Sequence, residues 1–318
     1  MNPRRERLWH GSLFDWWSGD QGRSSGYKFP RAFFRRGGHG KIPVTGTSLA
    51  LPVINEAARK LLALLRSAEV AGRSLKTLLI RASQQGKVSA QIYVKEKVVA
   101  QQISRHALEA LGLAGIELIY SDPHSPASVV SERLMSVGSG TLTDEILGIP
   151  FHYATEGFFQ INLPVYEMVL RDMQIFVLAD RPVIDLYSGV GSIGLTIGGK
   201  NPTLVEISGS AVAEMRRNLR ALGRHANIVH ASSESALEYI NSNATIIVDP
   251  PRAGLHEKVI QELLIKAPER IIYLSCNPVT QARDVMMLSE TYGIREHIGY
   301  NFFPRTPHIE HLVILDRK

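Results

Sequence analysis

The chain has 318 residues, 44% of them hydrophobic, with 36 Lys and Arg against 30 Asp and Glu, which suits two domains of ordinary size. Its single cysteine excludes an internal disulfide and an all-cysteine zinc or iron–sulfur site. No apolar run reaches the roughly 20 residues that span a bilayer, and the charged start lacks a signal-peptide core. We therefore expect a cytoplasmic monomer with no membrane segment and no iron–sulfur cluster.

The excess of positive charge lies at the N-terminus. Residues 1–50 carry nine Lys and Arg against three Asp and Glu, whereas the other 268 residues carry 27 of each. Aromatic residues are interleaved with these cations: Trp9, Trp16, Trp17, Tyr27, Phe29, Phe33 and Phe34. Cations beside stacking rings suit a nucleic-acid strand, although a basic tail without a ligand has the same composition. We predict that residues 1–45 form a basic, aromatic segment that contacts such a polyanion.

The next part of the chain, residues 46–150, mixes helical and strand patterns. The predicted elements are helices over 54–68 and 101–112, strands over 76–83, 89–99 and 115–122, and a glycine-punctuated hairpin over 132–154. These elements predict a small α+β domain.

From residue 151 onwards the pattern becomes regular. Short β-rich runs alternate with helical patterns, and the predicted strands lie at 182–187, 202–207, 226–231, 244–249 and 270–276. This alternation predicts a parallel, doubly wound sheet. In such a sheet ligands bind beyond the carboxyl ends of the strands, so the residues that end each strand are the candidates for a site.

The first of these strands runs into the loop "DLYSGVGSIG", residues 185–194. Gly189 and Gly191 open the following helix and let the backbone approach a ligand closely, although a plain tight turn uses the same residues. The second strand ends near Glu206, where the ribose hydroxyls of a bound nucleoside would lie. Dinucleotide enzymes share this geometry, but the loop lacks their GxGxxG pyrophosphate cradle. It instead resembles the first motif of class I methyltransferases, which bind S-adenosylmethionine.

Asp249 and Cys276 end the fourth and fifth strands, which are neighbours in the expected sheet. Asp249 either caps the next helix or contacts a ligand, because a carboxylate at a buried strand end needs a partner. A lone cysteine often only fills a gap in a core. Here, however, Pro278 predicts a helix N-terminus beside the sulfur, and its partial positive charge lowers the pKa of a thiol. We therefore expect Cys276 to lie in a site that activates it as a nucleophile.

Five motifs together resemble those of the RNA (uracil-C5)-methyltransferase family, which makes 5-methyluridine in tRNA and rRNA. They are "EGFFQIN", "DLYSGVGSIG", "DPPRAGL", "YLSCNPVT" and "FFPRTPHIEHLVIL", in the family's order and spacing. The resemblance extends weakly upstream to "SGYKFPRAFF" and "LPVINEA". It implies an α/β class I methyltransferase domain over residues 151–318 with a Rossmann-like doubly wound sheet. A smaller α+β RNA-recognition domain over residues 46–150 would precede it.

The family's pattern implies that Cys276 is the nucleophile and Glu310 the base. It implies no metal, and it places S-adenosyl-L-methionine and the uracil in a pocket lined by Gln160, Tyr187, Gly189, Ser192, Glu206 and Asp249. Many members have Asn where this chain has Ser192. Without the motif, Glu310 between two histidines would be interpreted as a surface ion-pair group.

The chemistry explains why these residue types are needed. Carbon 5 of uracil is too weak a nucleophile to take a methyl group from a sulfonium, so a thiolate first adds at carbon 6 and turns the ring into an enolate. After the methyl group is transferred, carbon 5 still carries its hydrogen. A base must remove that proton before the sulfur can leave.

Some features depart from the family and leave alternatives open. Many rRNA-acting members carry an RNA-binding barrel and four cluster-binding cysteines upstream, which this chain lacks, whereas "FFQIN" is more typical of the rRNA-acting type than of the tRNA-acting type. The RNA partner is therefore expected to be rRNA or tRNA. Two other functions remain: a class I methyltransferase that acts on an exocyclic base or protein amine without a covalent step, and a non-catalytic RNA-binding relative.

Overall fold

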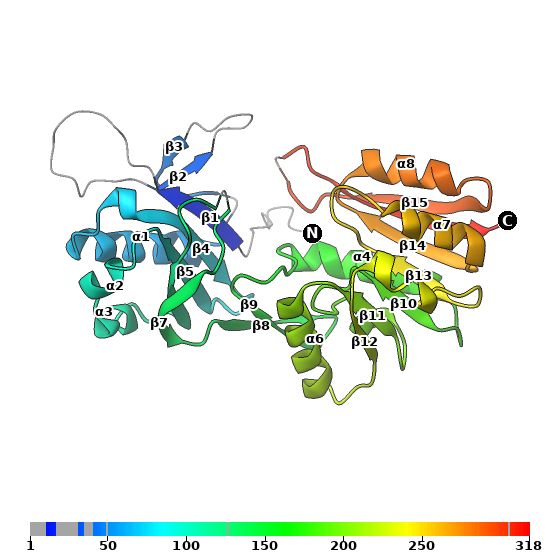
Figure 1. The fold of residues 1–318 in the computed structure, drawn as a ribbon, viewed down its shortest axis with the longest axis horizontal. Coiled ribbons are helices and arrows are strands. Elements are labelled where there is room, and N and C mark those ends of the chain that lie inside the picture. Colours follow the sequence, from blue (N-terminus) through cyan, green and yellow to red (C-terminus); the bar gives the residue numbers. More distant parts are fainter. Residues whose placement is uncertain (1–10, 17–30, 35–40, 49, 126, 305) are drawn as a thin grey trace, which may run out of the picture. The chain divides into compact units, whose positions relative to one another are not determined.

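The computed structural model describes residues 11–16, 31–34, 41–48, 50–125, 127–304 and 306–318. Most of the basic, aromatic segment expected over residues 1–45 therefore lies outside the described residues. The chain divides into two compact units (Figure 1): residues 1–144 with 153–156, and residues 145–152 with 157–318. The roles expected for the domains stay predictions.

The first unit is built on a seven-stranded sheet with the order β3-β2-β1-β4-β5-β6-β7. Its strands are β1 (Gly11–Trp16), β2 (Arg31–Phe34), β3 (Lys41–Val44), β4 (Leu75–Ala82), β5 (Val88–Val94), β6 (Gly115–Tyr120) and β7 (Glu132–Gly138). Only β5 and β6 pair in parallel, and all the other neighbours are antiparallel. Three strands from the N-terminal segment thus extend the sheet that was expected to begin after residue 46.

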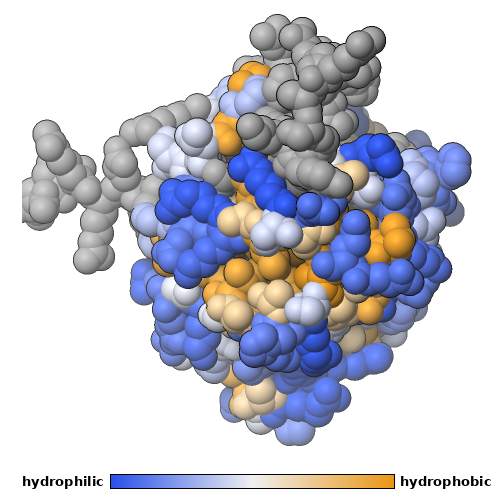
Figure 2. Space-filling view, turned by 90° about the vertical axis from the view of Figure 1, so that its left-hand side faces the viewer, coloured by the Kyte–Doolittle hydropathy of each residue, from blue (hydrophilic) through white to orange (hydrophobic). Residues whose placement is uncertain are grey.

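The helix α1 (Pro52–Ser67) lies where the helical pattern predicted it. Its buried residues recur at helical spacing and pack into one core with β4, β5 and β6: Ile54, Ala57, Ala58, Leu61, Leu62 and Leu65. Pro52 suits the first turn, because its missing N–H has no partner there in any helix. Figure 2 looks onto the side of this unit that carries the helices, where apolar side chains gather in the middle and polar ones surround them.

Two elements between residues 99 and 154 differ from the prediction. The helix expected over 101–112 is two short helices, α2 (Val99–Gln102) and α3 (Arg105–Glu109), because Ser104 leaves the helical conformation and its side chain caps the second. The hairpin expected over 132–154 is also divided. Its first strand, β7, pairs with β6, and only β8 (Thr141–Ile146) and β9 (Ile149–Ala154) form a two-stranded ribbon.

The second unit contains the predicted doubly wound sheet, with the order β12-β11-β10-β13-β14-β16-β15. Its strands are β10 (Val183–Leu186), β11 (Thr203–Glu206), β12 (Asn227–His230), β13 (Thr245–Val248), β14 (Arg270–Ser275), β15 (Tyr292–Tyr300) and β16 (Glu310–Arg317). The five predicted strands are parallel, and β16 then pairs antiparallel with both β14 and β15. The expected fold class is therefore confirmed.

Helices cover both faces of this sheet. They are α4 (Leu163–Phe176), α5 (Gly194–Ile197), α6 (Gly209–Ala221), α7 (Glu257–Lys266) and α8 (Pro278–Leu288). Alternate strand residues, such as Ile246 and Val248 of β13, share one core with buried residues of α7 and α8. The strand residues between them face the other side, where α4, α5 and α6 lie. Among the described helices, none combines the length and the apolar character needed to cross a bilayer.

One buried amide fastens α6 to the end of the ribbon. Asn218 is fully buried, and its carbonyl oxygen accepts from the His152 N–H at 2.7 Å. Its amide nitrogen donates to the carbonyl oxygens of His152 at 3.1 Å and of Val190 at 3.5 Å. The buried side chain thus pairs with backbone groups of two other segments, β9 and the glycine turn.

We expect Asn218→Ala to lower the free energy of unfolding by roughly 2–4 kcal/mol, because a buried side chain and its three hydrogen bonds to the backbone are lost. Urea titration followed by circular dichroism measures this change. Asn227→Ala is the control, since it removes the same amide from an exposed position in β12. Equal losses in the two variants would contradict this role of Asn218.

Candidate active site

Three neighbouring parallel strands bring their carboxyl ends to one edge of the second sheet. Strand β13 pairs with β10 on one side and with β14 on the other. Asp185 lies in β10, Asp249 directly follows β13, and Cys276 directly follows β14. The structure thus confirms the predicted adjacency of Asp249 and Cys276.

Glu310 reaches the same edge from the opposite chain direction. Strand β16 begins at Glu310 and runs antiparallel to β14, with Ser275 opposite His311. One residue further along, Cys276 and Glu310 therefore lie beside each other. Glu310 is only 4% exposed, so it is not the surface ion-pair group that its flanking histidines suggested.

Burial raises the pKa values of the Glu310 and Asp249 carboxyl groups toward neutrality. It raises the pKa of Glu310 to about 8, with a further contribution from the charge of Asp249 and an opposing one from Arg252. Burial likewise raises the pKa of Asp249 to about 7. A carboxyl group with a pKa near neutrality can exchange a proton with a substrate under physiological conditions.

The expected activation of the thiol is wrong for the free protein. The helix α8 does begin at Pro278 beside the sulfur. Burial nevertheless raises the pKa of the Cys276 thiol, and the nearby carboxylates of Glu310 and Asp249 raise it further. Only Arg252, whose side chain hydrogen-bonds the sulfur, lowers this pKa. The prediction took account of the helix end alone, because the two acids come from distant parts of the sequence.

The loop "DPPRAGL" is fixed by the start of α8. The carbonyl oxygen of Arg252 accepts hydrogen bonds from Asn277 Nδ2 at 2.9 Å and Thr280 Oγ1 at 3.1 Å. Gly254 has a φ of +84°, and a Cβ there would lie 2.5 Å from Asp284 Oδ2, so the turn requires glycine. Arg252, which sequence reasoning did not single out, is thereby held beside the sulfur.

The carboxylate of Asp284 binds the end of this loop. It is fully buried, and its Oδ2 accepts from the Tyr273 hydroxyl at 2.7 Å and from the Leu255 N–H at 2.8 Å. The same side chain pairs with Arg283, 2.6 Å away. One carboxylate therefore joins β14, α8 and the end of the loop.

The turn after β10 contains two glycines in the left-handed region, a few residues before α5 begins at Gly194. Gly189 and Gly191 have φ angles of +57° and +84°. The two carboxylate oxygens of Glu206 accept from the N–H groups of Gly189, at 2.9 Å, and Ser208, at 2.6 Å. The acid at the end of β11 is thus directly tied to the turn.

Asp185 has unused binding capacity at this turn. Its Oδ2 accepts from the Gly194 N–H at 2.9 Å, whereas its buried Oδ1 has no hydrogen-bond partner among the described residues. Burial raises the pKa of Asp185 to about 8. A buried oxygen of this kind fits a ligand that brings a hydrogen-bond donor or a positive charge, as the ammonium and sulfonium groups of S-adenosylmethionine would.

Ser192 and Tyr187, both expected beside a cofactor, have protein partners in the structure. Ser192 Oγ lies 2.8 Å from the hydroxyl of Tyr166, a buried residue of α4 that sequence reasoning missed because its spacing is that of an ordinary core position. The Tyr187 hydroxyl is hydrogen-bonded to the backbone of His256 and the side chain of Ser233. Tyr187 also has a φ of +65°, which only a tightly held turn maintains in a non-glycine residue.

Gln160 lies in the segment between β9 and α4. It is half-buried and makes no hydrogen bond with the described residues. Two residues later, the buried Asn162 donates from Nδ2 to the Phe302 carbonyl oxygen at 2.8 Å. This bond joins the motif "EGFFQIN" to the segment that leads to Glu310.

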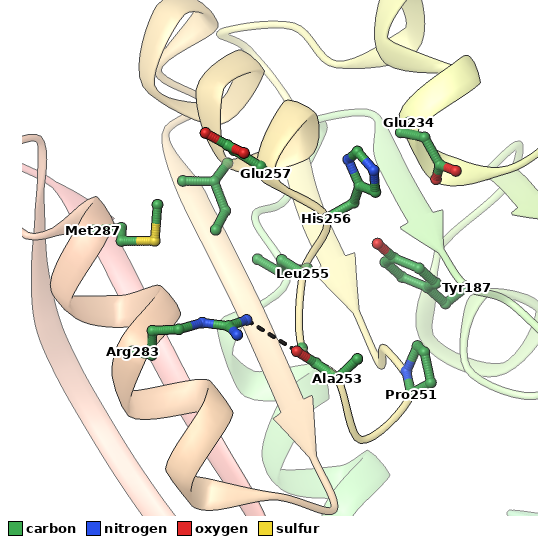
Figure 3. A pocket seen from close by; sticks show the side chains of 11 residues that line it. Tyr187, Glu234, Pro251, Ala253, Leu255, His256, Glu257, Arg283 and Met287 are labelled. Carbon is green, nitrogen blue, oxygen red and sulfur yellow. Dashed lines mark hydrogen bonds between the residues drawn. The ribbon is translucent and has the colours of Figure 1, made fainter.

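A pocket of about 560 Å³ adjoins this edge of the sheet (Figure 3). Tyr187 and His256 lie at one end of it, and Arg283 and Met287 of α8 lie at the other. Arg283 donates to the carbonyl oxygen of Ala253 at 2.9 Å across the loop. Of the expected site residues only Tyr187 lines this pocket, so the pocket lies beside Asp249 and Cys276 and does not contain them.

The fold is that of class I methyltransferases. The crystal structure of Pyrococcus abyssi tRNA (uracil-54, C5)-methyltransferase in complex with S-adenosyl-L-homocysteine matches it with a TM-score of 0.79 and 22% identity, over 96% of this chain and 75% of that one. Trm5b from Pyrococcus abyssi matches with a TM-score of 0.50 and 12% identity, over 72% of each chain. At these identities the likeness shows the fold alone.

The sequence also places the chain in a family. The model of the tRNA (Uracil-5-)-methyltransferase family matches residues 143–318, which is more than half of the chain. The chain therefore belongs to the tRNA (uracil-5-)-methyltransferase family, as its motifs indicated.

Curated relatives match this chain over part of their length. An uncharacterized RNA methyltransferase of Lactiplantibacillus plantarum is 36% identical over 195 residues, which cover 57% of this chain and 42% of that protein. Another, of Mycoplasma mobile, is 33% identical over 190 residues, which cover 55% of this chain and 49% of that protein. These matches span less than half the length of each relative.

The raised pKa of Glu310 makes the stability depend on pH. Between the ordinary pKa of 4.5 and the value of about 8, the folded protein holds a proton that the unfolded chain releases. The resulting stability is present below pH 4.5 and is lost as the pH rises through about 8. Gln resembles the protonated carboxyl group. At about pH 8.5 we therefore expect Glu310→Gln to have a free energy of unfolding that exceeds that of the wild type by on the order of 1–3 kcal/mol. At about pH 4.5, where the wild type holds the proton, we expect the two free energies to be equal.

Urea unfolding at the two pH values measures this difference. Glu290→Gln is the control, because Glu290 is exposed. A Glu310→Gln variant whose stability advantage does not grow with pH would show that the Glu310 carboxyl group is ionised in the folded protein.

Proposed function

We propose that this protein transfers a methyl group from S-adenosyl-L-methionine to carbon 5 of a uridine in tRNA or rRNA, through a covalent bond between Cys276 and carbon 6. The observation that carries the proposal is the meeting of Cys276, Asp249 and a buried Glu310 at one strand edge, next to a glycine turn bound to Glu206. A methyltransferase that acts on an amine needs neither a thiol nor a buried base there.

Each residue has a defined part in this reaction. The Cys276 sulfur bonds to carbon 6, and the electrons of the ring double bond move toward carbon 5 and the carbonyl oxygen. S-adenosylmethionine supplies the methyl group that carbon 5 takes. Glu310 then accepts the proton from carbon 5, the double bond re-forms, and the sulfur leaves carbon 6.

The charges in the site suit this order of events. A thiolate is stabilised by the hydrogen bond from Arg252 and by the N-terminus of α8. The acids oppose it only while they are ionised, and their raised pKa values keep them partly protonated at neutral pH. Glu310 must lose its proton before it can act as the base, so the final elimination should speed up as the pH rises toward 8.

The residues at the glycine turn would hold the cofactor. Glu206, which already accepts from Gly189, would accept the ribose hydroxyls, and the free oxygen of Asp185 would accept a donor of the methionine part. Gly189 allows the close approach. Tyr187 and Ser192 shape the turn through their hydrogen bonds. Gln160 and Asp249 would contact the cofactor or the uracil.

We expect S-adenosylhomocysteine to bind with an affinity that Glu206→Ala weakens by roughly 1–3 kcal/mol, because the ribose hydroxyls lose their acceptor. Isothermal titration calorimetry measures this loss. Glu290→Ala, an exposed carboxyl group on the same unit, should leave the affinity unchanged. Binding of NAD at least as tight as that of S-adenosylhomocysteine would refute the choice of cofactor.

The two catalytic roles can be separated by trapping. Cys276→Ala should abolish methylation and leave only non-covalent RNA binding. Glu310→Gln should still add to the ring and methylate it, and should then accumulate a protein–RNA adduct that survives denaturing electrophoresis. RNA with 5-fluorouridine at the target should trap the wild-type protein, since fluorine cannot leave as a proton.

Nucleoside mass spectrometry of total tRNA and rRNA, with and without the gene and mapped by site, identifies the target. Near-normal turnover by Cys276→Ala would mean that the thiol is not the nucleophile. Methylation of an amine in place of carbon 5 would replace the proposed reaction with the non-covalent one.

A further inference from the structure

A band of positive charge on α6 and the loop after it has no part in the chemistry above. Residues 157–318 are almost neutral, with 16 Lys and Arg against 17 Asp and Glu. Between residues 207 and 231, however, four arginines stand against a single acid, Glu214. The charge of this unit is therefore concentrated in one place.

The three arginines within α6 lie on one side of the helix. Its buried side is formed by Val212, Met215 and Asn218, which pack against the sheet and the ribbon. At about 100° per residue, Arg216, Arg217 and Arg220 fall within a single sector of about 100° on the opposite side. All three are exposed. Figure 1 shows α6 on the outside of the sheet, beside β11 and β12.

The protein itself does not neutralise this sector. Arg217 lies 3.3 Å from Glu214, but neither Arg216 nor Arg220 forms an ion pair with a described residue. Arg216 and Arg220 are also spaced i and i+4, so the two charges repel each other in the free helix. The helix dipole favours a cation in the last turn, which accounts for Arg220 and not for Arg216. The arrangement becomes favourable when an anion lies across it.

The band continues beyond the end of α6. A hollow of about 590 Å³ there is lined by Lys200, Arg224 and His225, with amide and hydroxyl groups around them and no acidic residue. The guanidinium group of Arg224 is held in this hollow by a hydrogen bond to the carbonyl oxygen of Leu195. Lys200 is exposed and makes no ion pair with a described residue.

We propose that this basic band, formed by Arg216, Arg220, Arg224 and Lys200, binds consecutive phosphates of the RNA that is methylated. Guanidinium groups match phosphate oxygens in shape and charge. The sector carries no exposed aromatic residue for stacking on bases, so the contacts follow the backbone and are independent of sequence.

The direction of α6 connects the band to the site. The helix begins at Gly209, just after Glu206 at the carboxyl edge, and ends just before β12 at the opposite edge. Its 13 residues span about 20 Å. A strand whose target uridine lies at Cys276 can thus be held by phosphates well away from the reacting base. The inference rests on the proposed function for the identity of its RNA.

The test is the salt dependence of binding to a fluorescently labelled, uridine-containing RNA stem-loop. Arg216→Gln/Arg220→Gln should lower the affinity and reduce the slope of log K against log salt by roughly 1.4 to 1.8, which is 0.7–0.9 for each phosphate that is no longer neutralised. The matched control, Arg171→Gln/Lys266→Gln, removes two exposed cations from α4 and α7 and should leave the slope unchanged.

Several results would overturn the proposal: an unchanged slope, an equal change in the control, or no RNA binding by the wild type. A loss confined to binding of anionic phospholipid vesicles or of polyglutamate would assign the band to a membrane or an acidic protein. Methyl transfer and S-adenosylhomocysteine binding, measured in parallel, separate the two proposals. If the wild type methylates RNA but the slope of the double variant is unchanged, only the proposal about the basic band is refuted. If the slope is reduced but the wild type methylates no RNA, the proposed reaction is refuted and the proposal about the basic band stands.

Discussion

The antiparallel pairing of β16 with β14 is the contact on which the candidate site depends. In a purely parallel sheet, the edge that holds the carboxyl ends of the strands receives no strand beginnings. Because β16 runs the other way, its first residue, Glu310, reaches the edge where β14 ends, just before Cys276. The ladder thereby brings a thiol and a carboxyl group from distant segments next to each other, one residue beyond its last pair, Ser275 and His311.

The helix after β14 provides the second constraint. Its first residues bind the carbonyl oxygen of Arg252, and the buried Asp284 accepts from Leu255 at the end of the same loop. The hydrogen bonds that shape "DPPRAGL" therefore start from the strand and helix that flank Cys276. The loop lies so close to α8 that a Cβ at Gly254 would be 2.5 Å from Asp284 Oδ2.

The sequence predicted the parts of this site that follow from strand order. Alternating strands and helices indicate a parallel sheet, and a parallel sheet assigns Asp185, Asp249 and Cys276 to one edge. The position of Glu310 came only from the family motif, because no local pattern reveals which strand an antiparallel strand joins. Sequence reasoning did not single out Arg252 for the same reason, because contacts with distant segments place it beside the sulfur. The helix expected over 101–112 failed for a local reason, since the side chain of Ser104 competes for backbone N–H groups.

The sign of the thiol's pKa shift shows where sequence reasoning stops. A helix end is visible in a sequence, but burial and the charges of Glu310 and Asp249 act through space, and here they outweigh it. The same burial keeps protons on three neighbouring carboxyl groups, those of Asp185, Asp249 and Glu310. A cation bound among them would lower their pKa values and release protons. A bound cation would therefore raise the ionised fraction of all three carboxyl groups at neutral pH, so the acid–base state of this edge depends on what occupies it.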